Sequence, residues 1–197
     1  MAARMLAVVS TLALVLSAAS ANPAAAAVRP ALVTDPASLV NPFIGTTNKA
    51  DDFPGADTPF GMVQWSPDTT SRPAGGGYEY GDSAITGFSL DHISGSGCAA
   101  EGDVPILPTV GAVDTSATDS FAHSGESASP GSYSVQTSNG VTTQLTVTPR
   151  SGMASFTFPE TSEANLIFQL NAGETSDSNP QFNVVGDAEV SGLVTIG

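Results

Sequence analysis

Short apolar runs, broken by Gly, Pro, Ser, Thr and Asn, fill the sequence from Val40 onward. This pattern restricts the folds that the chain can adopt more than any other feature. No window repeats its apolar residues with the 3.6-residue period of an amphipathic helix. Short runs at this spacing, separated by turn-forming residues, are typical of a β-sandwich or barrel. We therefore expect an all-β fold, an antiparallel β-sandwich with long Gly/Pro-rich loops.

Several segments have the apolar character expected of strands. They are Gly61–Trp65, Ala84–Leu90, Val104–Leu107, Ser132–Thr137, Val141–Thr148, Met153–Phe158, Asn165–Leu170, Gln181–Val185 and Ala188–Ile196. The clearest turn among them is Ser138-Asn139-Gly140, because Asn-Gly readily takes the positive φ angles of a tight hairpin. The long irregular loops all fall within residues 40–108, and function usually lies on such loops.

The first 27 residues predict a secretory signal peptide. A basic start at Arg4 precedes the apolar run Met5–Leu16, and small residues with Ala-x-Ala sites ending at Ala21 and Ala27 follow. The apolar run is shorter than the roughly 20 residues that span a bilayer. We expect a secreted protein with no membrane anchor, cleaved after Ala21 or Ala27. Residues 28–38 then form a short lead, and residues 39–197 form the domain.

Charge and cysteine content exclude several classes of protein. With 5 basic residues against 19 acidic ones, the net charge of −14 disfavours nucleic acid as a partner. The single cysteine, Cys98, excludes an intrachain disulfide. It is either a small buried hydrophobe, a reactive thiol or a group that pairs between chains. With only His92 and His123 beside it, no Cys/His spacing predicts a metal site.

Residues 40–108 carry a dense series of motifs. In order, they are Val40-Asn41-Pro42-Phe43-Ile44-Gly45-Thr46, Phe53-Pro54-Gly55-Ala56, Pro59-Phe60-Gly61-Met62-Val63-Gln64, Ser66-Pro67-Asp68-Thr69, Gly77-Tyr78 with Tyr80 and Asp82, Gly87-Phe88-Ser89, His92, Ser94-Gly95, Gly97-Cys98 and Gly102-Asp103. In order and spacing these resemble the N-terminal domain of glycoside hydrolase family 92. A weaker likeness continues from Ser129-Pro130-Gly131 to Phe156-Thr157-Phe158-Pro159.

The resemblance implies part of a calcium-dependent, inverting exo-α-mannosidase that acts on mannose-containing glycans. In that family an N-terminal β-sandwich meets a larger helical-barrel catalytic domain, and the active site lies between them. The general acid, the general base and the calcium site belong to the second domain. We therefore expect this chain to end before the catalytic domain, to need that domain as a partner, and to be inactive alone.

One acidic pair fits the geometry of inverting hydrolysis only in outline. Glu101 and Asp103 are two residues apart, so on a strand they would share one face. Inversion needs two carboxylates about 6.5–9.5 Å apart. Gly102 between them favours a loop, where such spacing means little. We assign no catalytic residue and no metal ligand in this chain.

The segment from Asp91 and His92 through Gly95, Gly97 and Cys98 is the sharpest local feature. Its glycines allow a close approach to another surface. His92 beside Asp91 either orients a sugar hydroxyl or packs at the interface with the catalytic domain. These residues are our candidates for substrate binding or the interface.

The aromatic residues add two further candidates for substrate binding or the interface. Tyr78 and Tyr80 follow the triple glycine 75–77, and we expect them to be exposed and able to stack on sugar rings. Trp65 is expected to pack in the core. Family members that resemble α-1,2-mannosidases carry a Trp-Asp-Gly-Cys-type insert before the Gly-Tyr, and the stretch Ser71–Gly77 has neither Trp nor Cys. The alternative to a mannosidase module is a self-standing, secreted carbohydrate-binding β-sandwich without hydrolase activity, or a purely structural domain.

Overall fold

The computed structural model describes residues 32–48, 51–95, 101–175 and 177–196. The chain divides into two units, Met1–Thr34 and Asp35–Gly197. The first unit contributes only residues 32–34 to the described part, so the signal peptide expected at residues 1–27 lies outside it. The second unit holds every described strand.

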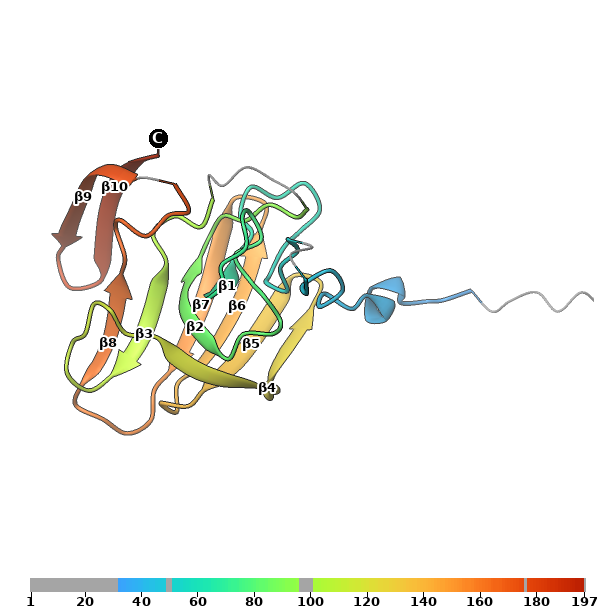
Figure 1. The fold of residues 1–197 in the computed structure, drawn as a ribbon, viewed down its shortest axis with the longest axis horizontal. Helices are drawn as coiled ribbons and strands as arrows, with labels where there is room; N and C mark the ends of the chain where they lie inside the picture. Colours follow the sequence, from blue (N-terminus) through green and yellow to red (C-terminus); the bar gives the residue numbers. More distant parts are fainter. Residues whose placement is uncertain (1–31, 49–50, 96–100, 176, 197) are drawn as a thin grey trace, which may run out of the picture. The chain divides into compact units, whose positions relative to one another are not determined.

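The second unit is built from strands, as expected. A short 3₁₀ helix, η1 (Pro36–Leu39), precedes them (Figure 1). The strands are β1 (Ser66–Thr69), β2 (Ala84–Ser89), β3 (Ile106–Val110), β4 (Asp119–Ser129), β5 (Ser132–Thr137), β6 (Thr142–Thr148), β7 (Ser151–Thr157), β8 (Ala164–Phe168), β9 (Asp177–Val185) and β10 (Glu189–Ile196). Every strand pairing is antiparallel, which confirms the predicted all-β class.

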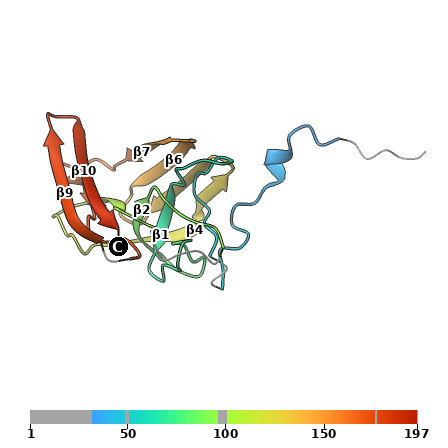
Figure 2. The same ribbon diagram turned by 90° about the horizontal axis from the view of Figure 1, so that it is seen from above.

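One curled sheet and one hairpin make up the architecture. The sheet runs in the order β7-β6-β5-β4-β2-β3-β8, with β1 added to β2, and β9 pairs with β10 separately. The long strand β4 belongs to both halves of the sheet, because it pairs with β2 at Asp119 and Ser120 and with β5 at Phe121 and again from Glu126 to Ser129. The register shifts between Phe121 and Glu126, as at a β-bulge, and such a shift bends a strand. The sheet therefore curls over a shared core (Figures 1 and 2).

The core draws side chains from both halves of the sheet. Its buried apolar members include Trp65, Tyr78, Ile85, Phe88, Leu107, Phe121, Tyr133, Val135 and Leu145. The indole of Trp65 donates from Nε1 to the Phe88 carbonyl at 3.3 Å, which satisfies its one polar group. The prediction that Trp65 packs in the core is confirmed.

The predicted hairpin at Ser138-Asn139-Gly140 is also confirmed. It joins β5 to β6, and Gly140 takes a φ of 86°. The Asn139 side chain closes the turn by accepting from the Val141 N–H at 2.9 Å and from the Thr137 hydroxyl at 2.7 Å. The local sequence was sufficient to predict this turn because the turn is stabilised by its own residues.

The predicted strand Gly61–Trp65 is wrong. The Gly61 N–H donates to the Thr58 carbonyl at 2.8 Å, so a turn occupies the start of this segment. Gln64 Nε2 then donates back to the Gly61 carbonyl at 2.9 Å, and only Trp65 forms an isolated bridge, to Ala56. Strand pairing begins one residue later, at Ser66 in β1.

Among the described residues, no helix is long and apolar enough to cross a bilayer.

Candidate functional site

Three loops from the motif-rich half of the chain come together beside β1. Backbone hydrogen bonds join them: the Tyr80 N–H donates to the Thr46 carbonyl at 2.7 Å, and the Gly95 N–H donates to the Asp51 carbonyl at 2.9 Å. The Ile93 N–H donates to the Gly75 carbonyl at 2.9 Å. Segments far apart in the sequence thus form one surface.

The triple glycine makes this meeting sterically feasible. A Cβ on Gly76 would lie 2.7 Å from the carbonyl carbon of Asp51. A Cβ on Gly77, whose φ is 66°, would lie 2.6 Å from Asp68 Oδ1 and 3.0 Å from the His92 ring. Any side chain at these positions would push the three loops apart.

His92 lies at the centre of the junction and is enclosed on all sides. Its Nδ1 lies 2.8 Å from the Gln64 carbonyl, and its Nε2 lies 3.3 Å from Asp68 Oδ1. The Ser89 hydroxyl donates to Asp68 Oδ2 at 2.8 Å, so its proton is already used. Both ring nitrogens therefore face acceptors and both carry a proton.

The imidazolium of His92 and the buried Asp68 carboxylate form an ion pair. Burial opposes the charged ring, but the hydrogen bond and charge of Asp68, helped by the Gln64 carbonyl, raise the pKa of His92 above its usual range. Since the ring has no exposed surface, it acts in this structure by holding β1 against the 91–95 loop. The neighbouring Asp91 accepts from the Asp103 N–H at 2.9 Å and so orders the far end of its own loop.

Tyr78 is buried, so the expectation that it is exposed is wrong. Its hydroxyl donates to the carboxylate of Glu126 at 3.0 Å, and the Tyr133 hydroxyl donates to the same carboxylate at 2.6 Å. Burial, followed by the charge of Glu126, raises the pKa of Tyr78 far above its usual value. The sequence pattern around the glycines gave no sign of this partner, because Glu126 lies on β4, a strand that the sequence did not predict.

Tyr80 remains partly exposed, at 37%. Its ring stacks on His123 with centroids 3.8 Å apart and planes 5° from parallel, and His123 Nε2 lies 2.7 Å from the Tyr80 carbonyl. His123 Nδ1 in turn lies 2.8 Å from Glu126. The Tyr80 ring is thus fixed at the edge of the loop surface.

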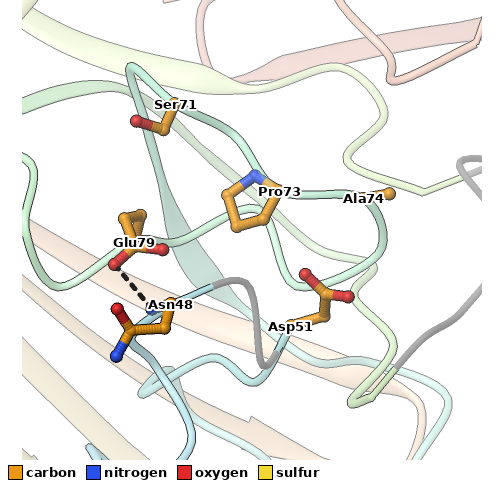
Figure 3. A pocket seen from close by; sticks show the side chains of 6 residues that line it. All are labelled: Asn48, Asp51, Ser71, Pro73, Ala74 and Glu79. Carbon is orange, nitrogen blue, oxygen red and sulfur yellow. Dashed lines mark hydrogen bonds between the residues drawn. The ribbon is translucent and has the colours of Figure 1, made fainter.

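A pocket opens on this surface between the loop that contains Asn48 and Asp51 and the loop that contains Ser71 and Glu79. It has a volume of about 590 Å³ and is lined by Asn48, Asp51, Ser71, Pro73, Ala74 and Glu79 (Figure 3). The Asn48 N–H donates to Glu79 Oε1 at 3.2 Å across it. Ser71 is anchored from behind by Asp82, which accepts from its N–H at 2.6 Å and from its hydroxyl at 2.7 Å.

The chemistry of this lining suits a ligand rich in hydroxyl groups. Asp51, Glu79 and Asn48 offer carboxylate and amide oxygens, and Ser71 offers a hydroxyl. None of the four was among the predicted site residues. The stretch Ser71–Gly77 was compared with the family only for the Trp and Cys that it lacks, so Ser71 was not singled out. Asn48 and Asp51 lie beside sequence motifs without belonging to them.

Asp103 does not present an open carboxylate, as a catalytic pair with Glu101 would require. Both side-chain oxygens of Asp103 are buried and accept no hydrogen bond from the described part of the protein. In the same part of the chain, no three His, Cys, Asp or Glu side chains come together to hold a metal ion. The donor set here therefore does not fit the calcium ion that the resemblance implies.

Two predicted residues, Gly97 and Cys98, lie outside the described residues. Gly95 is described: its φ is 84°, and a Cβ there would meet nothing within 4 Å. Of the predicted set, the structure brings His92, Asp91 and Gly95 to one junction and places Tyr78 and Tyr80 on its Glu126 side.

Comparison with known proteins places this geometry in a family. Residues 39–197 match the family described as the glycosyl hydrolase family 92 N-terminal domain. This chain belongs to that family. The family 92 fold is also found in a solved GH92 α-mannosidase from Bacteroides thetaiotaomicron, in complex with mannoimidazole. That structure shares 34% sequence identity with the chain and has a TM-score of 0.76 over 80% of it.

Two further relatives agree with the assignment to family 92. The structure of another GH92 glycosyl hydrolase shares 30% identity with a TM-score of 0.72 over 83% of this chain. An uncharacterized secreted glycosidase of Arthroderma benhamiae is 32% identical over an alignment of 130 residues that covers 61% of this chain. The family 92 chain described here spans 23% and 24% of the two structures and 17% of the fungal protein.

Proposed function

We propose that this chain is the N-terminal module of a secreted family 92 α-mannosidase, which hydrolyses α-mannosidic bonds in glycans. The family match over residues 39–197 carries the proposal. It is supported by the likeness to a GH92 α-mannosidase whose structure contains mannoimidazole. Export is supported by the signal-peptide pattern of residues 1–27 and by the relative named a secreted glycosidase.

Within such an enzyme, the module's part is to shape one wall of the mannose pocket. The polar pocket and the partly exposed Tyr80 supply groups that bind sugar hydroxyls and stack on sugar rings. His92, Asp91, Gly95 and Tyr78 act as positioning residues that keep the loops in place. Gly97 and Cys98, which follow Gly95 in the sequence, belong to the same proposal.

The acid, the base and the calcium ion would come from the partner catalytic domain. Among the described residues, no three His, Cys, Asp or Glu side chains form a metal site, and no step of the reaction is assigned to these residues. The module alone should therefore bind weakly and release no mannose.

A chimera tests this directly. Residues 39–197 would replace the matching part of the B. thetaiotaomicron α-mannosidase, and release of mannose from α-mannosides would be measured with calcium present. We expect the chimera to be active. His92→Ala in the chimera should lower activity at least tenfold and destabilise the module, because breaking a buried ion pair costs about 3–5 kcal/mol.

The matched control in the chimera is Asp187→Asn, which changes an exposed carboxylate in the β9–β10 turn. It should leave both activity and stability as they are. A chimera that folds with native circular dichroism but releases no mannose would contradict the proposed function.

A self-standing carbohydrate-binding domain is the second candidate, because Asn48, Asp51, Ser71 and Glu79 of this chain line a polar pocket. Titration calorimetry of the isolated chain with α-mannobiose distinguishes the two. Saturable binding that Asp51→Asn abolishes would favour the binding domain.

A further inference from the structure

Glu126 places a carboxylate inside the domain, where its side chain is only 1% exposed. The Tyr133 hydroxyl donates to Oε1 at 2.6 Å, the Tyr78 hydroxyl lies 3.0 Å from each carboxylate oxygen, and His123 Nδ1 lies 2.8 Å from Oε2. Burial, followed by the charge of Glu126, raises the pKa of Tyr78 and of Tyr133 well above the usual value for tyrosine. Both hydroxyls therefore keep the protons that they donate, and the carboxylate is fixed from three sides.

The irregular shape of β4 brings Glu126 and His123 together. The two residues are three apart in the sequence, and in a regular strand such residues point to opposite faces of the sheet. Between Phe121 and Glu126, however, the register of β4 with β5 shifts. A shift of this kind changes the direction of side chains, which is why His123 can reach the buried carboxylate.

His123 connects Glu126 to Tyr80. Its Nε2 donates to the Tyr80 carbonyl at 2.7 Å, since a carbonyl oxygen can only accept. Its ring stacks on the Tyr80 ring with centroids 3.8 Å apart, and the Phe121 ring meets it edge-on at 5.4 Å. The imidazole thus covers one face of the Tyr80 ring, while Tyr80 as a whole stays partly exposed.

Glu126 in this way holds both neighbours of a pocket residue. It binds Tyr78 directly, through the tyrosine hydroxyl, and it binds Tyr80 through His123. Glu79 lies between the two tyrosines in the sequence and lines the polar pocket (Figure 3). Tyr78 is buried and Tyr80 is not, so the two contacts fix the inner and the outer end of one short segment.

We propose that Glu126 is a positioning residue of the candidate sugar site, which acts from inside the domain through Tyr78 and His123. It determines where Glu79 and Tyr80 lie on the surface. The ligand class that these two suit is a pyranose, because a carboxylate accepts from sugar hydroxyls and an aromatic ring packs on the apolar C–H face. The choice of ligand rests on the proposed function, whereas the arrangement of the side chains does not.

NMR of the isolated chain tests the positioning without any sugar. In the wild type the ring protons of His123 should lie at high field, because the Tyr80 ring stacks on them. Glu126→Gln should keep this shift, since its amide oxygen accepts from both tyrosines and its amide N–H can donate to His123 Nδ1. Glu126→Ala removes these partners and should lose the shift. Retention of the shift in folded Glu126→Ala, or its loss in Glu126→Gln, would overturn the proposal.

The chimera with the B. thetaiotaomicron enzyme tests the effect on the site, through kcat and KM for mannose release. Glu126→Ala should raise KM about tenfold and leave kcat within about twofold, because misplaced groups bind the ground state and the transition state less well alike. A variant that only unfolds part of the protein would lower kcat instead. Glu126→Gln should have the wild-type KM, and Glu160→Gln, at an exposed glutamate after β7, should change neither constant.

The two measurements separate this inference from the proposed function. If the unmodified chimera releases no mannose, the proposed function fails and the NMR result alone decides the positioning. If the unmodified chimera is active and Glu126→Ala displaces Tyr80 without changing KM, Glu126 does not position the site. Should Glu126→Ala fail to fold, His123→Ala breaks the same connection at a side chain that is 33% exposed, and an unchanged KM there would equally contradict the proposal.

Discussion

At the scale of single residues, Phe60 breaks an ordinary rule of backbone conformation. It is the third residue of the turn that the Gly61 N–H closes on Thr58, and its φ is 61°. Turns of this kind favour glycine there, and a bulky residue costs about 1–3 kcal/mol. The Phe60 side chain is fully exposed, at 103%, so no burial within the described chain offsets this strain.

Phe60→Gly should therefore raise the free energy of unfolding by about 1 kcal/mol, once the greater freedom of glycine in the unfolded chain is subtracted. A urea titration measures this as a higher midpoint. Met62→Gly is the matched control: Met62 is also exposed, but its φ is not positive, so this change should lower the midpoint. Equal shifts for the two variants would show that the turn is not strained.

At the scale of elements, β7 packs against the core at Gly152, a residue without a side chain. A Cβ on Gly152 would lie 2.4 Å from Trp65 Cε3 and 2.9 Å from Cζ3. The Trp65 ring is buried and cannot swing aside without opening the core. The Trp65 ring therefore leaves room only for glycine at position 152 of β7.

Gly152→Ala should destabilise the domain by about 1–3 kcal/mol, the usual cost of overpacking a core. Trp65 is the only tryptophan in the chain, so its fluorescence follows both unfolding and any local shift of the ring. Gly125→Ala in β4 is the control, since its Cβ would meet its nearest neighbour at an ordinary 3.4 Å. A neutral Gly152→Ala would mean that the ring is looser than the structure shows.

The elements also show how much of the fold can be predicted from the sequence alone. The β5–β6 hairpin was predictable because Asn139 and Gly140 determine the turn locally. Strand β4 was not, because its sequence from Asp119 to Ser129 is mostly polar and its pairing depends on two distant partners. The candidate site divides in the same way. The motif loops were found, but the pocket residues Asn48, Asp51, Ser71 and Glu79 carry no pattern until the fold brings them together.

At the scale of the whole molecule, the β9–β10 hairpin leaves apolar side chains uncovered. Val184 and Val190 face each other in register and are 71% and 43% exposed, and Phe182, Val185, Leu193 and Ile196 are also exposed. Apolar surface of this kind favours association or aggregation. The acidic net charge of −14 opposes it by repulsion.

Placing charges on this hairpin should remove most of the association. Val184→Lys with Val190→Glu puts an opposite-charge pair across the two strands, which the register supports. We expect less binding of an apolar dye and less self-association at high salt, measured by fluorescence and sedimentation. Val113→Lys, an exposed valine outside the strands, should change neither.

The pairing of β3 with β8 has a consequence for the order in which the chain folds. Val110 pairs with Ala164, and the strands β4 to β7 lie between them in the sequence. The β4–β7 meander closes through short turns. Strand β3 can pair with β8 only when the long loop that contains the whole meander closes, and closures of such long loops are slow. We expect the meander to form early and the β3–β8 edge to close late, so the newly made chain carries an open sheet edge for most of its folding time.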